Sequence, residues 1–253
     1  MSAAASLDEL VARLRTAKHV FILTGAGVSA ESNLPTFRDP GGLWDHHRPE
    51  DLASPDAFAK HPARVQSWYA HRRRAALDAQ PNAAHHAIAQ LAQHMPDLTL
   101  VTQNVDGLHQ RAGSTQVLEI HGSLHRWHCS NTGEPIDDSA LDAQLPANPD
   151  DPPMRSPSGT GYARPAVVWF GEGLPTDVLA EAEAKARTAD IALSVGTSAL
   201  VYPAAALPLI AQHAGAFTAE INPQPSAIAH QLDASITQPA GIALPQLSRA
   251  LTG

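Results

Sequence analysis

The chain has little cysteine and no long hydrophobic run. A single cysteine, Cys129, among 253 residues leaves no partner for an intrachain disulfide, which is usual for proteins of a reducing compartment. No apolar stretch approaches the ~20 residues that a membrane-spanning helix needs. The first residues also lack the basic start and apolar core of a signal peptide. We therefore expect a cytoplasmic protein with no membrane segment.

Positive charge is also scarce. Lys and Arg total 17 against 25 Asp and Glu, so the formal net charge is −8. Such a chain has no electrostatic footprint for nucleic acid or for an anionic membrane surface, and we expect neither partner. Hydrophobic residues make up 43% of the chain, which is enough for one large domain or for a large domain with a smaller insertion. A monomer is the expected state.

Short apolar runs alternate with amphipathic segments along most of the chain. The expected strands are His19–Thr24, Leu98–Thr102, Val117–Ile120, Ala166–Phe170, Ile191–Val195 and Phe217–Ile221. Such nearly continuous apolar runs suit strands that are covered on both faces. The expected helices lie near the N-terminus, with Leu7 and Leu10 on the apolar face, and around residues 55–79, 82–95, 177–188, 203–213 and 243–251. This alternation predicts an α/β fold with a doubly wound parallel sheet.

Residues 40–80 and 122–165 interrupt this alternation. The second of these regions is rich in Pro, Asp, Ser and Gly. Structureless loops of such length are uncommon inside a compact domain. We therefore interpret both regions as parts of a small inserted module, and residues 1–39, 81–121 and 166–253 as the sheet domain.

A glycine turn, Gly25–Ser29, follows the first apolar run directly. Glycines after a strand allow a tight turn and close approach of a ligand, and the N–H groups of the next helix can bind phosphate. The motif is a partial G-x-G-x-x-G fingerprint, because Ala30 occupies its last position. Phe37 and Arg38 would cover a bound dinucleotide. A purely structural turn, followed by a core Phe and a surface Arg, remains an alternative.

Four polar side chains crowd the end of the second apolar run: Gln103, Asn104, Asp106 and His109. Short polar side chains at a strand end often bind the local backbone and form a turn. That explanation suits one such residue better than the group Gln103-Asn104-x-Asp106. Ligands bind beyond the carboxyl ends of the strands in open α/β sheets, so the group is a candidate site.

His121 follows the third apolar run in the same way. The ordinary pKa of histidine, ~6.5, suits a general base near neutral pH. The chain has 14 histidines, most of which we expect at the surface or in incidental positions.

Six motifs occur in a fixed order: GAGVSAESNLPTFRD (25–39), TQNVDGLHQRAG (102–113), His121-Gly122, RPAVVWFGE (164–172), GTS (196–198) and INP (221–223). Together they resemble the sirtuins, the NAD-dependent protein lysine deacylases, in a bacterial-type form. The resemblance extends from about residue 18 to about residue 240. It implies a Rossmann-like large domain and a smaller module, with NAD and an acyl-lysine peptide bound between them.

The resemblance also implies a role for individual residues. The implied cofactor-binding set is Gly25, Ala26, Gly27, Ser29, Ala30, Phe37, Arg38, Trp44, Gln103, Asn104, Asp106, Gly196, Thr197, Ser198, Asn222 and Ala240. The implied catalytic residues are His121, as general base, with Asn104 and Asp106. Val168, Trp169 and Phe170 would bind the substrate backbone by strand addition. His109 lies outside these direct contacts.

The chain departs from the family pattern at two places. Asn33 stands where the family commonly has Gly, and Asn tolerates a positive φ better than most residues. Many sirtuins also hold zinc with two Cys-x-x-Cys pairs, but here only Cys129 remains, because Thr132, Ser156 and Gly159 replace the other three. Structural zinc needs four good N or S donors, so we expect no zinc in this chain.

An unusual metal site is the alternative, since His125 and His128 lie near Cys129 in the sequence. This group still lacks a fourth ligand. We favour a module held together by packing of Leu124, Trp127 and Tyr162.

Tyr69 and Arg72 suggest the kind of acyl group. They are three residues apart in an expected helix and so share one face. A phenol and a guanidinium would suit a carboxylate, although a half-buried ring and a solvated charge fit the spacing equally. The sirtuin subgroup called class III has Tyr-x-x-Arg here and removes succinyl, malonyl and glutaryl groups, and Ala30 matches its small residue beside the acyl pocket.

The resemblance therefore predicts a desuccinylase or demalonylase that acts on acylated lysine-containing proteins and releases nicotinamide and O-acyl-ADP-ribose. Three alternatives remain: a plain deacetylase, a mono-ADP-ribosyltransferase, and a catalytically inactive nucleotide-binding scaffold. The presence of His121, Asn104 and Asp106 argues against the scaffold, because a decayed site need not keep them.

Overall fold

The computed structural model describes residues 7–36, 48–95 and 97–252. Its largest element is a six-stranded parallel sheet with the strand order β3-β2-β1-β7-β8-β9. The strands are β1 (Val20–Thr24), β2 (Leu98–Thr102), β3 (Val117–Glu119), β7 (Ile191–Val195), β8 (Phe217–Ile221) and β9 (Ala234–Ile236). The predicted α/β fold class, a Rossmann-like doubly wound sheet with a small second module, is confirmed.

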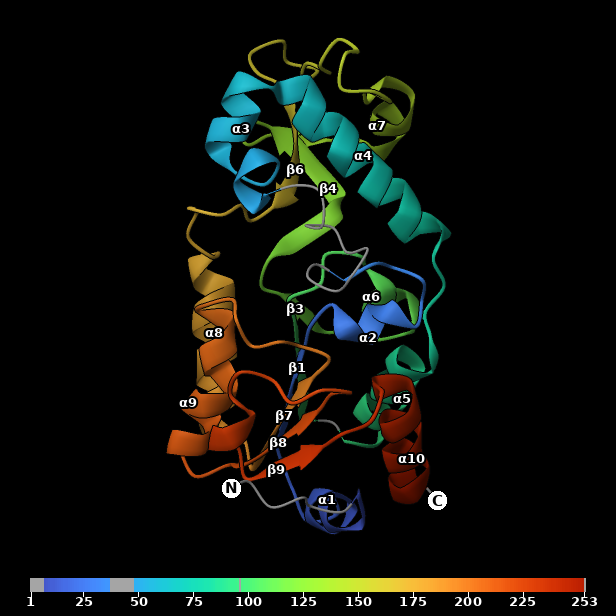
Figure 1. Cartoon of the computed structure of the whole chain (residues 1–253), viewed down its shortest axis with the longest axis vertical. Coiled ribbons are helices and arrows are strands. Elements are labelled where there is room, and N and C mark those ends of the chain that lie inside the picture. The colour runs from blue at the N-terminus through green and yellow to red at the C-terminus, as the bar shows by residue number, and fades with distance from the viewer. Residues whose placement is uncertain (1–6, 37–47, 96, 253) are drawn as a thin grey trace.

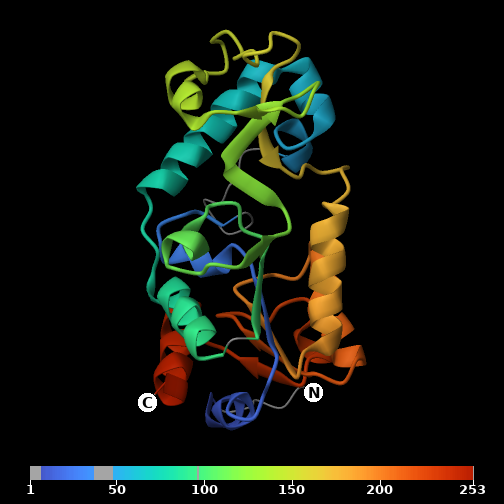
Figure 2. The ribbon, with the colours of Figure 1, turned by 180° about the vertical axis from the view of Figure 1, so that it is seen from behind.

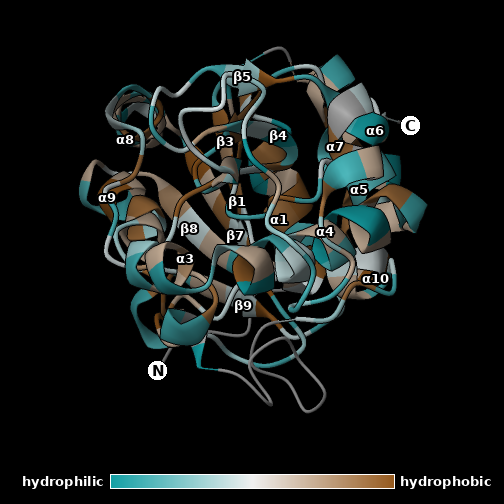
Figure 3. Cartoon of the chain, turned by 90° about the horizontal axis from the view of Figure 1, so that it is seen from above, coloured by the Kyte–Doolittle hydropathy of each residue, from teal (hydrophilic) through white to brown (hydrophobic). Residues whose placement is uncertain are grey.

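Helices cover both faces of this sheet (Figures 1 and 2). One face packs against α1 (Leu7–Leu14), α5 (Ala83–His94) and α10 (Ala240–Thr252), and the other against α8 (Thr176–Thr188) and α9 (Leu207–His213). The strands between them are buried, as the continuous apolar runs predicted. Hydrophilic residues are prominent on the outer helices when the molecule is seen from above (Figure 3).

The strand order reverses at β1, which lies between β2 and β7. Thr24, Thr102 and Val195 are in register, so the three central strands end level with one another. Ligands of doubly wound sheets bind in the crevice beyond such a reversal. Two short helices begin there, α2 (Gly27–Ala30) after β1 and α6 (Leu108–Arg111) after β2.

A second, three-stranded antiparallel sheet lies above the first (Figure 1). It contains β5 (Pro135–Ile136), β4 (Gly122–Cys129) and β6 (Ala163–Val167), with the helices α3 (Pro55–Lys60), α4 (Pro62–Asp78) and α7 (Asp138–Gln144) around it. Its core includes Leu124 and Trp127, with the partly buried Tyr162 packed against it, as expected for this module. Short 3-10 helices lie at Pro49–Asp51, Ala204–Ala206 and Ala229–Gln231.

Three details of the fold differ from the sequence prediction. Of the run expected as a parallel strand, Ala166–Phe170, only Ala166 and Val167 lie in a strand, β6, which pairs antiparallel with β4. Residues of β6 alternate between buried and half-buried positions, which is typical of a sheet covered on one face. The helix expected over 55–79 breaks at His61, because Pro62 begins a new helix. The strands β4, β5 and β9 were not predicted, although β4 and β5 lie in the region expected as part of the small module.

Within the described residues, no helix is long and apolar enough to cross a membrane.

Candidate active site

The glycine turn after β1 crosses the turn after β7. The N–H of Gly27 donates to the carbonyl oxygen of Gly196 (2.8 Å). A Cβ atom on Gly25 would lie 2.6 Å from Cβ of Thr197, and one on Gly27 would lie 2.8 Å from the Gly196 oxygen. Gly196 itself has φ +60°. These glycines are therefore needed for the close approach of the two turns, both of which are predicted to bind the cofactor.

Asn104 and Asp106 are buried at the end of β2 and are bonded to the glycine turn. Asn104 Nδ2 donates to the Gly25 carbonyl (3.1 Å) and to Ser29 Oγ (3.1 Å). Ser29 Oγ donates in turn to Asp106 Oδ2 (2.7 Å), and the N–H of Leu108 donates to Asp106 Oδ1 (2.9 Å). These polar groups thus form one network that joins the ends of β1 and β2.

Gln103 extends this network toward β7 and β8. Its Nε2 donates to Thr197 Oγ1 (3.0 Å), and Asn222 Nδ2 donates to the Thr197 carbonyl (3.0 Å). Ser198 is exposed beside them, and Ala240 is buried at the start of α10. The remaining predicted cofactor-binding residues therefore follow β7, β8 and β9 at the same edge of the sheet.

His121 lies between β3 and β4, where the two sheets meet. Its Nδ1 donates to the Gln103 carbonyl (3.1 Å), because a carbonyl oxygen only accepts. Nε2 then carries the lone pair. Burial lowers the pKa of His121 below its usual value, while the bond to Gln103 acts in the opposite direction. The imidazole is therefore neutral near pH 7 and able to accept a proton at Nε2.

Two buried histidines lie beneath the polar network. His109 Nε2 is 2.9 Å from Thr24 Oγ1, and its ring centroid is 4.8 Å from that of His85. Burial lowers the pKa of His85 to about 4 and that of His109 to about 3. Both rings are therefore neutral near pH 7. His85 had no sequence signal. His109, which the resemblance places outside the direct contacts, is buried beside it.

Tyr69 and Arg72 lie on one face of α4, as their spacing predicts. Tyr69 is only 1% exposed, and its ring centroid is 6.3 Å from that of Trp169. The Arg72 guanidinium carbon lies 5.4 Å from the centre of the Tyr69 ring and 4.7 Å from that of Trp68.

The electrostatics of this pair agree with a place near the active site. Burial lowers the pKa of Arg72, while Tyr69 and the Asp106 carboxylate oppose that shift. Burial raises the pKa of Tyr69 to about 12, so its phenol keeps its proton. Arg72 therefore carries its positive charge next to a neutral phenol.

The predicted substrate segment leaves β6 and crosses between the two sheets. The N–H of Val168 donates to the His121 carbonyl (3.0 Å), and that of Phe170 donates to Ala53 (2.9 Å). The Trp169 ring is buried in the core of the small module, whereas Phe170 is 42% exposed. Within this segment, Phe170 and the half-buried Val168 are thus more open to a peptide than Trp169.

Hydroxyl groups surround Cys129 where many sirtuins hold zinc. Its Sγ lies 3.6 Å from Thr160 Oγ1 and 3.8 Å from Ser158 Oγ, which is itself 2.6 Å from Ser156 Oγ. His125 is bonded elsewhere, to the Asp106 carbonyl. In the part of the chain that the structure describes, no group of three His, Cys, Asp or Glu side chains is arranged to hold a metal ion.

The remaining predictions concern residues in and after the turn that follows β1. Asn33 adopts φ +60°, so the prediction that Asn would take the positive-φ position is confirmed. Ala26 is half-buried at the start of α2, and Ala30 is exposed at its end. Phe37, Arg38 and Trp44, which the resemblance assigns to the cofactor, lie outside the described residues.

Comparison with known proteins identifies the family of this chain. The model of the "Sir2 family" matches residues 25–203. "NAD-dependent protein deacylase 1" of Pseudomonas aeruginosa is 48% identical over 243 residues, which cover 95% of this chain and 97% of that protein. The "NAD-dependent protein deacylase" of Methylococcus capsulatus is 45% identical over 250 residues, covering 96% of each chain.

Solved structures give the same result. A Sir2 homologue in complex with NAD is 41% identical, with a TM-score of 0.89 over 100% of this chain and 96% of that one. A Sir2 protein with a deacetylated peptide and an O-acetyl-ADP-ribose is 28% identical, with a TM-score of 0.86 over 98% of each chain. From its sequence motifs, its fold and these matches, the chain belongs to the Sir2 family, the sirtuins.

Proposed function

We propose that this sirtuin is an NAD-dependent protein lysine deacylase that removes succinyl and malonyl groups in preference to acetyl. The coarser activity is supported by the deacylase names of its relatives, which cover nearly its whole length. The preference for acidic acyl groups is supported by one observation, the placement of the Arg72 guanidinium beside the Tyr69 ring on one face of α4.

The residues at the sheet edge fit NAD. The glycine crossing leaves no room for side chains, and the amides of Gln103 and Asn104 offer donors and acceptors in a mostly buried setting. Asn104 and Asp106 would hold the nicotinamide end, and Thr197 with Asn222 the adenosine end. When bound, NAD supplies a weak nicotinamide–ribose bond, whose cleavage makes the sugar carbon electrophilic toward the acyl oxygen.

His121 would act as the general base on a ribose hydroxyl. Its Nε2 accepts the proton while Nδ1 stays bonded to the Gln103 carbonyl, which keeps the ring oriented and favours the imidazolium once it forms. The lowered pKa keeps the ring neutral before the transfer. The pH profile should therefore lose activity only as pH falls below ~6.5, the ordinary pKa of histidine.

Tyr69 and Arg72 would select the acyl group. The positive charge of Arg72 suits the terminal carboxylate of a succinyl or malonyl chain, and the neutral phenol of Tyr69 is a hydrogen-bond donor. The rings of Trp68 and Tyr69 hold the guanidinium in a partly desolvated place, where a charge pair is stronger than in water. An acetyl group offers this pair no carboxylate.

A panel of acyl-lysine peptides tests the proposal. The wild-type protein is incubated with NAD and one peptide that carries succinyl, malonyl, glutaryl or acetyl lysine, and the products are identified by mass spectrometry. We expect nicotinamide and O-acyl-ADP-ribose, with a kcat/KM for the succinyl or malonyl peptide at least about tenfold above that for acetyl, as one good charged hydrogen bond allows.

Each other outcome contradicts a defined part of the proposal. A higher kcat/KM for the acetyl peptide would overturn the acyl preference and leave the deacylase. ADP-ribosylated protein without deacylated lysine would point to a transferase instead. Nicotinamide release that does not depend on an acylated peptide would contradict deacylation itself.

A further inference from the structure

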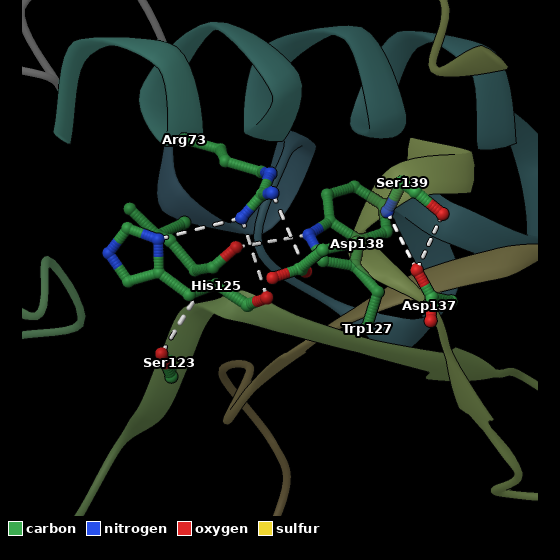
Figure 4. Close-up of polar contacts among 8 residues, drawn as sticks. Arg73, Ser123, His125, Trp127, Asp137, Asp138 and Ser139 are labelled. Carbon is green, nitrogen blue, oxygen red and sulfur yellow. Dashed lines mark hydrogen bonds and ion pairs between the residues drawn. The ribbon is translucent and has the colours of Figure 1, made fainter. Parts of the chain in front are cut away.

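We propose that His125 is a positioning residue through which the small module holds the loop 103–107 in the shape that binds the nicotinamide end of NAD. The inference rests on the proposed function only in assigning that loop to NAD. Figure 4 shows His125 on β4 beneath Arg73 of α4. His125 belongs to none of the motifs that carry the sirtuin resemblance.

Two bonds join β4 to this loop. His125 Nε2 donates to the Asp106 carbonyl oxygen (2.7 Å), and the N–H of Leu124 donates to the Val105 carbonyl (2.9 Å). The imidazole also packs against Gly107, where a Cβ atom would lie 2.8 Å from His125 Cδ2 and Nε2. Gly107 has φ +71°, so the peptide between Asp106 and Gly107 has both a special conformation and a side-chain partner.

Arg73 orients the imidazole from the other side. Its side chain is 4% exposed, and its Nη1 lies 3.4 Å from the His125 carbonyl oxygen and 3.5 Å from Nδ1. Its Nη2 lies 3.5 Å from Asp138 Oδ1, so the guanidinium sits between β4 and the start of α7 (Figure 4). Because the Asp106 carbonyl only accepts, Nε2 carries the hydrogen and Nδ1 presents its lone pair to Arg73.

The loop is thus held from two sides. On the side of the large sheet, Gln103 and the Asp106 carboxylate are bonded to Thr24 and Ser29. On the side of the small module, His125 holds the Asp106 backbone. Removing the imidazole donor would free that peptide to rotate and would displace the Asp106 side chain, while the adenosine side at Thr197 and Asn222 would keep its own bonds.

The test compares His125→Leu with His125→Gln, because glutamine keeps an N–H donor at a similar reach and leucine does not. Dissociation constants for NAD and for ADP-ribose are measured by calorimetry, and kcat and KM with the best acyl peptide. We expect His125→Leu to weaken NAD binding and raise KM for NAD about tenfold, as the loss of one buried bond allows. ADP-ribose binding should stay within about twofold, and His125→Gln should recover most of the loss.

A second variant tests the role of Arg73. Arg73→Met should weaken NAD binding by a smaller factor, and adding it to His125→Leu should cause little further loss, because both act through one contact. His128→Leu is the matched control, because His128 lies further along the same strand, where it pairs with Arg164 of β6, and this variant should bind NAD as the wild type does.

Two results would overturn the inference. Equal loss of NAD and ADP-ribose binding in His125→Leu would indicate a general disturbance of the fold, and unchanged NAD binding would show that the imidazole does not position the loop. A wild type that binds NAD but turns over no acyl peptide would contradict the proposed function, while the binding comparison would still decide the role of His125.

Discussion

The predicted site residues of the large sheet domain and of the small module are held by different kinds of contact. In the large sheet, Asn104, Asp106 and Thr197 follow directly after strands and are bonded to neighbouring strand ends. In the small module, Tyr69 and Arg72 lie on a helix and are held by aromatic packing against Trp68 and Trp169. In the function proposed above, the base catalysis lies at the strand ends and the acyl selection on the helix, so the two should be separable by mutation.

The largest expected effect is a loss of turnover that leaves the fold and the acyl preference unchanged. His121→Ala should lower kcat about 10²- to 10⁴-fold, the usual contribution of a general base, for succinyl and acetyl peptides alike. The melting temperature should change little, because His121 is only half-buried and its side chain is held by a hydrogen bond to the Gln103 carbonyl rather than by core packing. Activity assays with both peptides and a thermal melt check this.

His128→Ala is the control for His121, since it removes a half-buried histidine of β4 that lies outside the strand-end network. It should retain near-normal turnover. Near-normal turnover in His121→Ala, or a loss confined to one acyl group, would contradict the role of His121 as a base common to all substrates.

The second effect is a loss of folding stability in acid, caused by the two buried histidines beneath the strand ends. His85 and His109 have pKa values of about 4 and about 3 in the folded protein, below the ~6.5 of the unfolded chain. The unfolded state therefore binds more protons as pH falls below ~6.5, and the stability due to the neutral rings is lost toward pH 3–4. At pH 4 we expect a loss on the order of 3 kcal/mol per histidine.

Urea unfolding of the wild type and of His109→Gln between pH 7 and pH 4 measures this loss. The free energy of unfolding should fall less steeply with acid in the variant, which lacks one buried titratable ring. Parallel curves for the two proteins would show that His109 does not carry the expected protonation cost.

The smallest expected effect is on the small module. Hydroxyl groups surround Cys129 where many sirtuins hold zinc, so we expect packing around Trp127 to hold this module. A strong chelator should shift the melting temperature by less than about 1 °C, because no metal binding would be linked to folding. Stoichiometric zinc by elemental analysis, with a large shift on chelation, would contradict this expectation.

The sequence predicted the large sheet better than the small module, for a physical reason. Buried parallel strands are continuous apolar runs, and the polar groups that follow Val101 and Val195 mark their carboxyl ends. By contrast, β6 alternates buried and half-buried residues and begins before the apolar run that suggested a strand. His125 and His85 had no sequence signal as positioning or buried groups, because their partners Asp106 and His109 are brought to them only by the fold.

The separation of acyl selection from base catalysis is tested most directly in Arg72→Met. The measured quantity is the ratio of kcat/KM for the succinyl peptide to kcat/KM for the acetyl peptide. Arg74→Met, which removes an exposed arginine of the same helix, is the matched control. We expect the ratio to fall about 10- to 100-fold in Arg72→Met, as the loss of a hydrogen bond to a charged group allows, while acetyl turnover stays near that of the wild type. An unchanged ratio in Arg72→Met, and likewise in Arg72→Met combined with Tyr69→Phe, would contradict this expectation.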